Sequence, residues 1–214
     1  MEVTIRNAKK TDAGFLAWVM VAAGRSHVER GYWDFTFPGD EEKRLEFIGK
    51  LATAGFKSIC NFEGFLVAEV DGQAAAALSG YEPEKATDSV FVEMLNEVLL
   101  KEGWAKKDLD DMINRIGPFL TCTPKFHKDA WVVEWVATLP EYRRYGLVSK
   151  QLEKIFQKGQ GLGYKKSQIG VLIGNTPAQR AYEKAGFKFL DEKRHPDFEA
   201  TIKCPGVARL ERLL

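Results

Sequence analysis

The sequence predicts an α/β protein in which strands and helices alternate along the chain. Residues 131–187 show strand, turn, helix, strand and helix patterns in that order. Asp71-Gly72 joins two apolar runs, as in a β-hairpin, and apolar residues alternate with polar ones near both ends of the chain. The 214 residues contain no linker, repeat or low-complexity run, so we expect a single domain over residues 1–214.

The N-terminal quarter is expected to contain one strand and two helices. Residues 3–5 alternate as in a strand, and either Thr11 or Asp12 can cap a helix that runs to about Gly24. A second helix is predicted over residues 41–54, because its apolar residues share one helical face.

A β-hairpin and a long insertion follow. Residues 65–70 and 73–81 pair through the Asp71-Gly72 turn. Residues 82–130 then carry two helical stripes of apolar residues, and we expect Gly117-Pro118 to end the second helix. Insertions of this length are more often functional than idle.

The next segment has the composition of a phosphate-binding turn. Residues 131–138 are nearly all β-branched or aromatic, which is typical of a strand buried on both faces. Arg143, Arg144 and Gly146 then precede an amphipathic helix over residues 148–156. A glycine turn at a helix start leaves backbone N–H groups free to bind phosphate oxygens. Taken alone, an ordinary turn with two solvated arginines is the alternative.

A second motif follows the next strand. Asn175 or Thr176 can cap a helix with Pro177 in its first turn, and Gly186 suits the left-handed position after it. Three alanines share one face of this helix with Tyr182, its one large polar side chain there. Taken alone, a buried tyrosine with one hydrogen bond is the alternative.

In this order the two motifs resemble the acetyl-CoA-binding core of GNAT-superfamily N-acetyltransferases. The family pattern is Arg/Gln-x-x-Gly-x-Gly/Ala, followed by Asn-x-x-Ala-x-x-x-Tyr-x-x-x-Gly-Phe. The matching residues are Arg143, Gly146, Asn175, Ala178, Tyr182, Gly186 and Phe187. Val148 departs from the pattern, because the family usually has Gly or Ala there. The strong match covers about a quarter of the chain.

The resemblance implies a fold. We expect a central, mixed, mostly antiparallel twisted sheet that is flanked by helices. Residues 82–130 are then a helical insertion between the third and fourth strands, and residues 187–194 and 207–214 are the closing strands.

The resemblance also implies a reaction, in which an acetyl group moves from acetyl-CoA to a primary amine by direct attack. We expect Glu134 to be the general base, because it is an acidic residue in an apolar strand, where charges are rare. Strand alternation would place it on one face with Val136 and Thr138. A Glu paired with a nearby Lys or Arg is the alternative. Tyr182 is expected to give a proton to the departing sulfur, and a backbone N–H near Val136 to stabilise the oxyanion.

Two groups of binding residues are expected. Family geometry assigns the cofactor to the strand, the turn and the last motif: Val136, Ala137, Thr138, Arg143, Arg144, Tyr145, Gly146, Leu147, Val148, Ser149, Asn175, Ala178 and Tyr182. Acidic and aromatic residues between the first two helices are expected to bind the acceptor, together with the insertion: Glu29, Tyr32, Trp33, Asp34 and Phe35. Core packing is the alternative for each ring.

Composition limits the remaining possibilities. The chain has 31 basic and 30 acidic residues, which is not a nucleic-acid footprint, and no apolar run approaches ~20 residues, so we expect neither nucleic acid nor membrane as partner. Cys60, Cys122 and Cys204 are isolated, and the histidines lack metal-ligand spacing, so neither a disulfide framework nor a metal site is favoured. We expect a cytoplasmic monomer or homodimer whose acceptor is a small-molecule or peptide amine.

Two other functions remain open at this stage. One is a non-catalytic domain that binds or senses acyl-CoA, which Val148 favours because a valine narrows the approach to the phosphates. The other is an acetyltransferase that modifies a protein or peptide N-terminus. The presence of both Glu134 and Tyr182 favours an enzyme.

Overall fold

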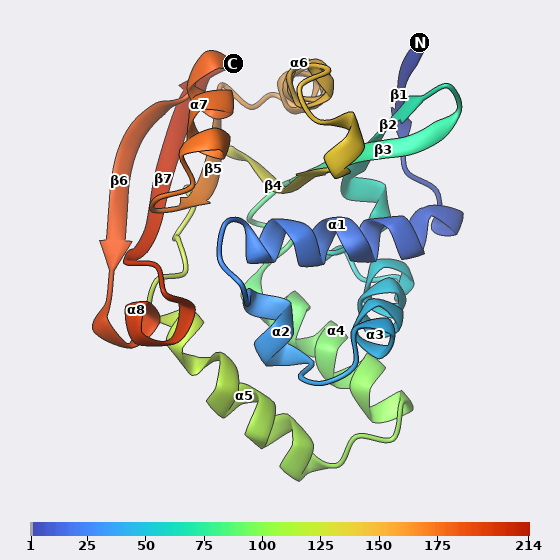
Figure 1. The fold of residues 1–214 in the computed structure, drawn as a ribbon, viewed down its shortest axis with the longest axis vertical. Helices are drawn as coiled ribbons and strands as arrows, with labels where there is room; N and C mark the ends of the chain where they lie inside the picture. The colour runs from blue at the N-terminus through green and yellow to red at the C-terminus, as the bar shows by residue number, and fades with distance from the viewer. Residues whose placement is uncertain (1) are drawn as a thin grey trace.

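The computed structural model describes residues 2–214, which form a seven-stranded mixed sheet (Figure 1). The strand order is β1-β2-β3-β4-β5-β7-β6, and every neighbouring pair is antiparallel except β4 with β5. The strands are β1 Val3–Asn7, β2 Phe65–Val70, β3 Gln73–Tyr81, β4 Trp131–Thr138, β5 Lys166–Leu172, β6 Lys188–Arg194 and β7 Gly206–Leu213. This confirms the expected mixed, mostly antiparallel sheet.

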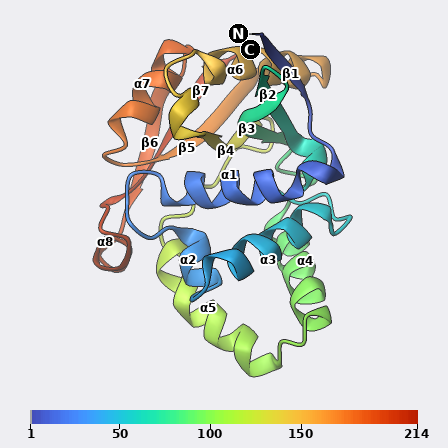
Figure 2. The same cartoon turned by 45° about the vertical axis from the view of Figure 1, so that its right-hand side comes forward.

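Helices cover both faces of the sheet (Figures 1 and 2). They are α1 Ala13–Arg25, α2 Tyr32–Thr36, α3 Glu41–Thr53, α4 Asp88–Lys101, α5 Lys106–Leu120, α6 Leu147–Gly161, α7 Thr176–Lys184 and α8 Pro196–Ile202. Short 3₁₀ turns lie at η1 Lys10–Asp12, η2 Phe62–Gly64 and η3 Pro140–Tyr142.

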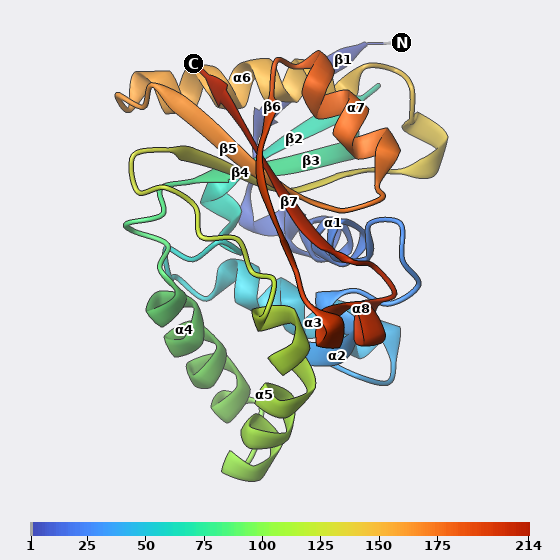
Figure 3. The same cartoon turned by 90° about the vertical axis from the view of Figure 1, so that its left-hand side faces the viewer.

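Two apolar clusters hold these layers together. On one face, α6 and α7 pack over Leu78, Trp131 and Leu210 of the sheet. On the other face α1 crosses the sheet, and α2, α3 and α4 pack beyond it around Trp33 and Trp135. Figure 3 shows this sequence of layers, with α6 along one side of the sheet and the helices of the insertion farthest from it.

The insertion joins β3 to β4, as expected, and forms two helices that pack against the rest of the molecule. α4 contacts α3, whereas α5 contacts α2 and α8. Near the end of α5, Phe119 and Cys122 meet Phe198 of α8 in a smaller apolar cluster. The insertion therefore lies on the α1 side of the sheet, beside the residues between the first two helices.

Four details differ from the sequence-based expectations. α5 continues through Pro118 to Leu120, because a proline in the last turn interrupts little of the remaining ladder. Residues 32–36 form a helical turn, and α8 occupies the connection between the closing strands. The first helix begins at Ala13 with Asp12 at its N-cap position, although the Asp12 carboxylate binds Arg6 instead of capping it.

None of the helices in residues 2–214 combines the length and the apolar character that crossing a membrane requires.

Candidate active site

The two central strands pair over a short stretch and then separate. β4 and β5 are in register only from Trp131 opposite Ser167 to Val133 opposite Ile169. From Glu134 onward, the β5-facing edge of β4 is unpaired within residues 2–214, while β3 continues to pair with its other edge as far as Thr138. Unpaired backbone N–H and C=O groups at such an edge can bind a ligand that lies along the strand.

A β-bulge sits at the point of separation. Ser79 of β3 is opposite Glu134, whereas Ala77 is opposite Ala137, so β4 has one more residue than β3 in this interval. Trp135 within the bulge has a φ of 51°, which is rare for a residue other than glycine. Backbone strain of this kind costs about 1–3 kcal/mol and is concentrated at functional sites.

The bulge corrects the expected orientation of Glu134. Val133 packs in the cluster beneath α6, and so does Val136, although the two are three residues apart. Trp135 and Ala137 pack in the cluster around α1. The extra residue therefore reverses the alternation, and Glu134 points to the α1 face, opposite to Val136.

Glu134 lies next to the apolar cluster on that face. Burial raises the pKa of its carboxyl to about 7, although the backbone N–H of Trp135 donates to it and lowers the pKa in part. Burial, and next the charge of Glu134, raise the pKa values of Cys60 and Tyr81, which lie on the same face. The side chain is nonetheless only partly covered. A carboxyl with this pKa can both accept and release a proton near neutral pH.

Tyr182 approaches the gap between β4 and β5 from α7. Its ring is buried against Phe187, and its hydroxyl has no hydrogen-bond partner among residues 2–214. Burial and then the charge of Glu134 raise its pKa above the ordinary value, so the phenol keeps its proton at neutral pH. The expected acid and base are thus brought within electrostatic reach of each other from different elements.

Asn175 holds the start of α7, as its motif predicted. Its Oδ1 accepts from the backbone N–H of Ala178 at 3.2 Å, and its Nδ2 donates to Ser26 Oγ at 2.5 Å. The second contact ties α7 to the end of α1. Asn175 therefore positions the helix that carries Tyr182, and its contact with a cofactor stays a prediction.

The turn before α6 has the geometry expected of an anion-binding site. Gly146 has a φ of 74°, which favours glycine, and a Cβ placed on it would meet nothing within 4 Å. The first intrahelical bond is donated by Lys150, so the preceding N–H groups have no acceptor in the helix. Arg143 and Arg144 are exposed beside them. A pyrophosphate fits this open, positively charged turn, and so the residues present suit acetyl-CoA.

The other expected cofactor residues surround this turn. Arg143 Nε donates to the backbone oxygen of Thr138 at 3.4 Å, which joins the turn to the end of β4. Tyr145 and Ser149 are exposed, whereas Leu147 is buried and offers only its backbone. Val148 is partly buried and packs against the cluster beneath α6.

The expected acceptor residues differ in how deeply they are buried. Trp33 is fully buried, its Nε1 has no partner within residues 2–214, and its ring centroid lies 5.6 Å from that of Trp135. Tyr32 and Phe35 are partly exposed, and Glu29 is exposed on the connection before α2. Gly31, at the start of α2, lets the chain approach the end of α1 closely. A Cβ on Gly31 would stand 2.2 Å from the backbone of Gly24.

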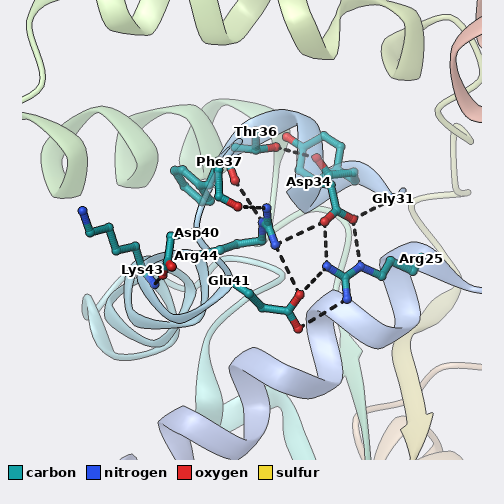
Figure 4. Close-up of polar contacts among 11 residues, drawn as sticks. Arg25, Gly31, Asp34, Thr36, Phe37, Asp40, Glu41, Lys43 and Arg44 are labelled. Atoms are coloured by element: carbon teal, nitrogen blue, oxygen red, sulfur yellow. Dashed lines mark hydrogen bonds and ion pairs between the residues drawn. The ribbon is translucent and has the colours of Figure 1, made fainter. Parts of the chain in front are cut away.

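Asp34 is at the centre of an ion network, shown in Figure 4. Its carboxylate accepts from Arg25 Nη2 at 2.7 Å and Nε at 3.0 Å, from the backbone N–H of Gly31 at 2.8 Å, and pairs with Arg44 Nη1 at 3.2 Å. Glu41 extends the network through the same two arginines. These contacts fill about four acceptor positions, the capacity of a carboxylate. The structure therefore shows that Asp34 ties α2 to α1 and α3, and its expected role in binding an amine stays a prediction.

A cavity of about 380 Å³ lies between α3 and the insertion, lined by Phe37, Phe47, Trp104, Arg115 and other residues. None of the five named acceptor residues lines it, although Trp104 and Arg115 belong to the insertion that was expected to help bind the acceptor. Within residues 2–214, His, Cys, Asp and Glu side chains form no cluster that could hold a metal ion.

The chain was compared with known proteins. A family model for the acetyltransferase (GNAT) family matches residues 28–187, which include Glu134, Tyr182 and the turn before α6. The chain belongs to the GNAT acetyltransferase family. No curated protein matches it in sequence.

Solved structures show that the GNAT fold extends over the whole chain. A crystal structure of an acetyltransferase has 20% identity and a TM-score of 0.70, with 98% of each chain covered. An N-acetyltransferase from Staphylococcus aureus Mu50 has 16% identity and a TM-score of 0.66, covering 99% of this chain and 100% of its own. A putative acetyltransferase from Salmonella typhimurium, solved with its cofactor acetyl-CoA, has 15% identity and a TM-score of 0.54, covering 99% and 94%.

Three residues near Glu134 were not foreseen. Ser79 Oγ donates to the backbone oxygen of Glu134 at 3.2 Å, and Tyr81 and Cys60 are within electrostatic reach of its carboxyl. The register of β3 with β4 depends on the bulge, which has no signature in the sequence of β4. Ser79 is, however, a polar residue in the apolar run of β3, a signal of the same kind as Glu134 itself.

Proposed function

We propose that this GNAT protein transfers the acetyl group of acetyl-CoA to a primary amine by direct attack, with Glu134 as general base and Tyr182 as general acid. The bound thioester would supply the acetyl group. The new bond joins the amine nitrogen to the acetyl carbon, the carbon–sulfur bond breaks, and CoA leaves with a proton on its sulfur.

Glu134 would remove the proton that prevents attack. A lysine-like amine has a pKa of about 10.4 and is almost entirely protonated at neutral pH. The pKa of the carboxyl is about 7, so a large share of the protein is ionised at that pH and ready to take the proton, directly or through water.

The open edge of β4 and Tyr182 would act on the thioester, at its carbonyl oxygen and its sulfur respectively. A free backbone N–H near Val136 can donate to the carbonyl oxygen as negative charge develops there. The Tyr182 phenol keeps its proton because its pKa is raised, so it remains a donor for the departing sulfur. The α6 turn at Gly146 would hold the pyrophosphate, with Arg143 and Arg144 beside it.

One observation supports this proposal above the others. β4 leaves β5 immediately before Glu134, so the base, the free strand edge and Tyr182 surround the same gap. Val148 does not argue for a degenerate site, because its side chain packs beneath α6.

The proposal is tested by following free thiol from acetyl-CoA with and without amines. A panel of simple amines, amino acids, polyamines, aminoglycosides and peptides should contain acceptors that raise thiol release above background, with an acetylated amine as product. Binding of CoA without acetylation of any member would favour a binding or sensing domain. Peptides as the exclusive acceptors would favour the modification of N-termini.

A further inference from the structure

The α1 face around Glu134 carries a second group suited to an amine. Tyr81 lies two residues after Ser79 on the same face of β3, and Ser79 is opposite Glu134. Tyr81 and Glu134 are therefore diagonal neighbours across the two strands, within reach of one another's side chains. The Tyr81 hydroxyl has no hydrogen-bond partner among residues 2–214, although most of the residue is covered.

The insertion brings a further carboxylate to this face. Phe91 of α4 packs on Trp33, with 6.4 Å between ring centroids, and Trp33 also contacts Trp135, the neighbour of Glu134. Asp88 stands three residues before Phe91 and thus on the same side of α4. Its side chain is exposed, at the first turn of the helix.

The electrostatics agree with this placement. After burial, the charge of Asp88 contributes to the raised pKa of Tyr81, and also to that of Tyr32 on α2. Tyr32 packs edge-on against Trp33, with 5.0 Å between ring centroids. Tyr81 is therefore within electrostatic reach of both Glu134 and Asp88, and Tyr32 is within reach of Asp88.

We propose that the acceptor is a small diamine, whose reacting amine lies at Glu134 and whose second ammonium pairs with Asp88. This rests on the proposed function. The aromatic faces of Tyr32 and Tyr81 suit a cation and its alkyl chain. A dication matches the two carboxylates, whereas a monoamine of the same length leaves Asp88 without its ion pair.

Asp88 also has an ordinary structural role, because an acidic residue in the first turn favours helix formation. The experiment must separate the two roles. Diaminobutane and butylamine form a matched pair that differs in the second ammonium. Asp88→Asn and Glu93→Gln form a matched pair of variants, since each removes one negative charge from an exposed position of α4.

Steady-state thiol release with both amines should show a KM for diaminobutane at least about fivefold below that for butylamine, with similar kcat. Asp88→Asn should bring the ratio of the two KM values close to one, and Glu93→Gln should keep it. In a thermal scan with CoA present, diaminobutane should raise the melting temperature of wild type more than that of Asp88→Asn.

The inference is overturned if wild type uses both amines with equal KM, if Asp88→Asn keeps the preference, or if neither amine is acetylated. In each of these cases the proposed function still stands when another amine is acetylated. A wild-type protein that neither binds CoA nor acetylates any amine would instead remove the proposed function itself.

Discussion

Ser79 and Glu134 face each other across β3 and β4, and the Ser79 hydroxyl donates to the backbone oxygen of Glu134 at 3.2 Å. This contact fixes β4 at the residue where its bulge begins and where β5 departs. Glu134 alternates with Val133 and so faces α1, and the bulge that follows it turns Val136 to the opposite face. The bulge therefore places the proposed base and Val136 on opposite faces of the sheet.

Glu134→Gln should remove a pH dependence from the reaction. In wild type, kcat/KM should rise with pH as the carboxyl ionises through a pKa of about 7. The variant should lack this rise, be slow at pH 7 and recover partly at high pH, because the amine then loses its proton unaided. A pH–rate profile of thiol release measures this, and full activity of the variant at pH 7 would assign the base elsewhere.

The same substitution should change the pH dependence of stability. The pKa of Glu134 is raised from 4.5 to about 7, so between these values the folded state binds more protons than the unfolded state. The free energy of unfolding contributed by this group therefore falls as pH rises through that window.

Glu134→Gln removes this contribution. The melting temperature of the variant minus that of wild type should therefore increase by a few degrees between pH 4.5 and pH 8. Glu153→Gln, at an exposed position of α6, is the control and should show no such trend. If the difference in melting temperature is constant with pH, the pKa of the Glu134 carboxyl is not raised by burial.

Tyr182→Phe keeps the ring and removes the proton. We expect kcat to fall by about 10²-fold, the low end for general acids, with little change in CoA affinity. Tyr164→Phe is the matched control, because Tyr164 packs on Trp131 in the same cluster while its hydroxyl binds Glu82. Equal rates for wild type and Tyr182→Phe would leave the sulfur to be protonated by solvent.

Asp34→Asn should lower the stability of the fold and leave acceptor binding unchanged. Burial raises the pKa of Asp34, but hydrogen bonds from Arg25 and Gly31 and the charge of Arg44 bring it below its ordinary value. Breaking a buried ion pair costs about 3–5 kcal/mol, which corresponds to roughly 10 °C in melting temperature for a chain of this size. The acceptor KM should be unchanged.

Glu41→Gln offers a milder comparison, since Glu41 is more than half exposed in the same network. If Asp34→Asn instead raised the acceptor KM at an unchanged melting temperature, the amine-binding role suggested by the sequence would be correct.

The parts of the fold that were predictable have strong local signals. Asp71-Gly72 determines the hairpin, and Asn175 caps α7 with the residue and spacing that the motif requires. The left-handed conformation of Gly186 follows from its place directly after α7. In each case, the structure follows from a few neighbouring residues.

The parts that were missed depend on contacts between distant segments. The bulge at Trp135 is stabilised by pairing with β3 and by the hydrogen bond from Trp135 Nε1 to Ile59 O at 3.0 Å. Asp34 resembles a surface acid in sequence, and only the approach of Arg25 and Arg44 makes it part of the packing. Periodicity cannot show such long-range partners.

The central claim, that acetyl-CoA binds at the turn before α6, is tested most directly by thermal scans of wild type and two variants with CoA. At a hundredfold excess over the dissociation constant, binding contributes about 2.7 kcal/mol, or roughly 5–10 °C. Gly146→Asn and Gly146→Asp have side chains of the same shape that tolerate a positive φ, and they differ in charge. We predict a shift of this size for wild type, a shift retained in large part by Gly146→Asn, and none for Gly146→Asp. An unchanged wild-type melting temperature, or equal shifts for the two variants, would contradict the claim.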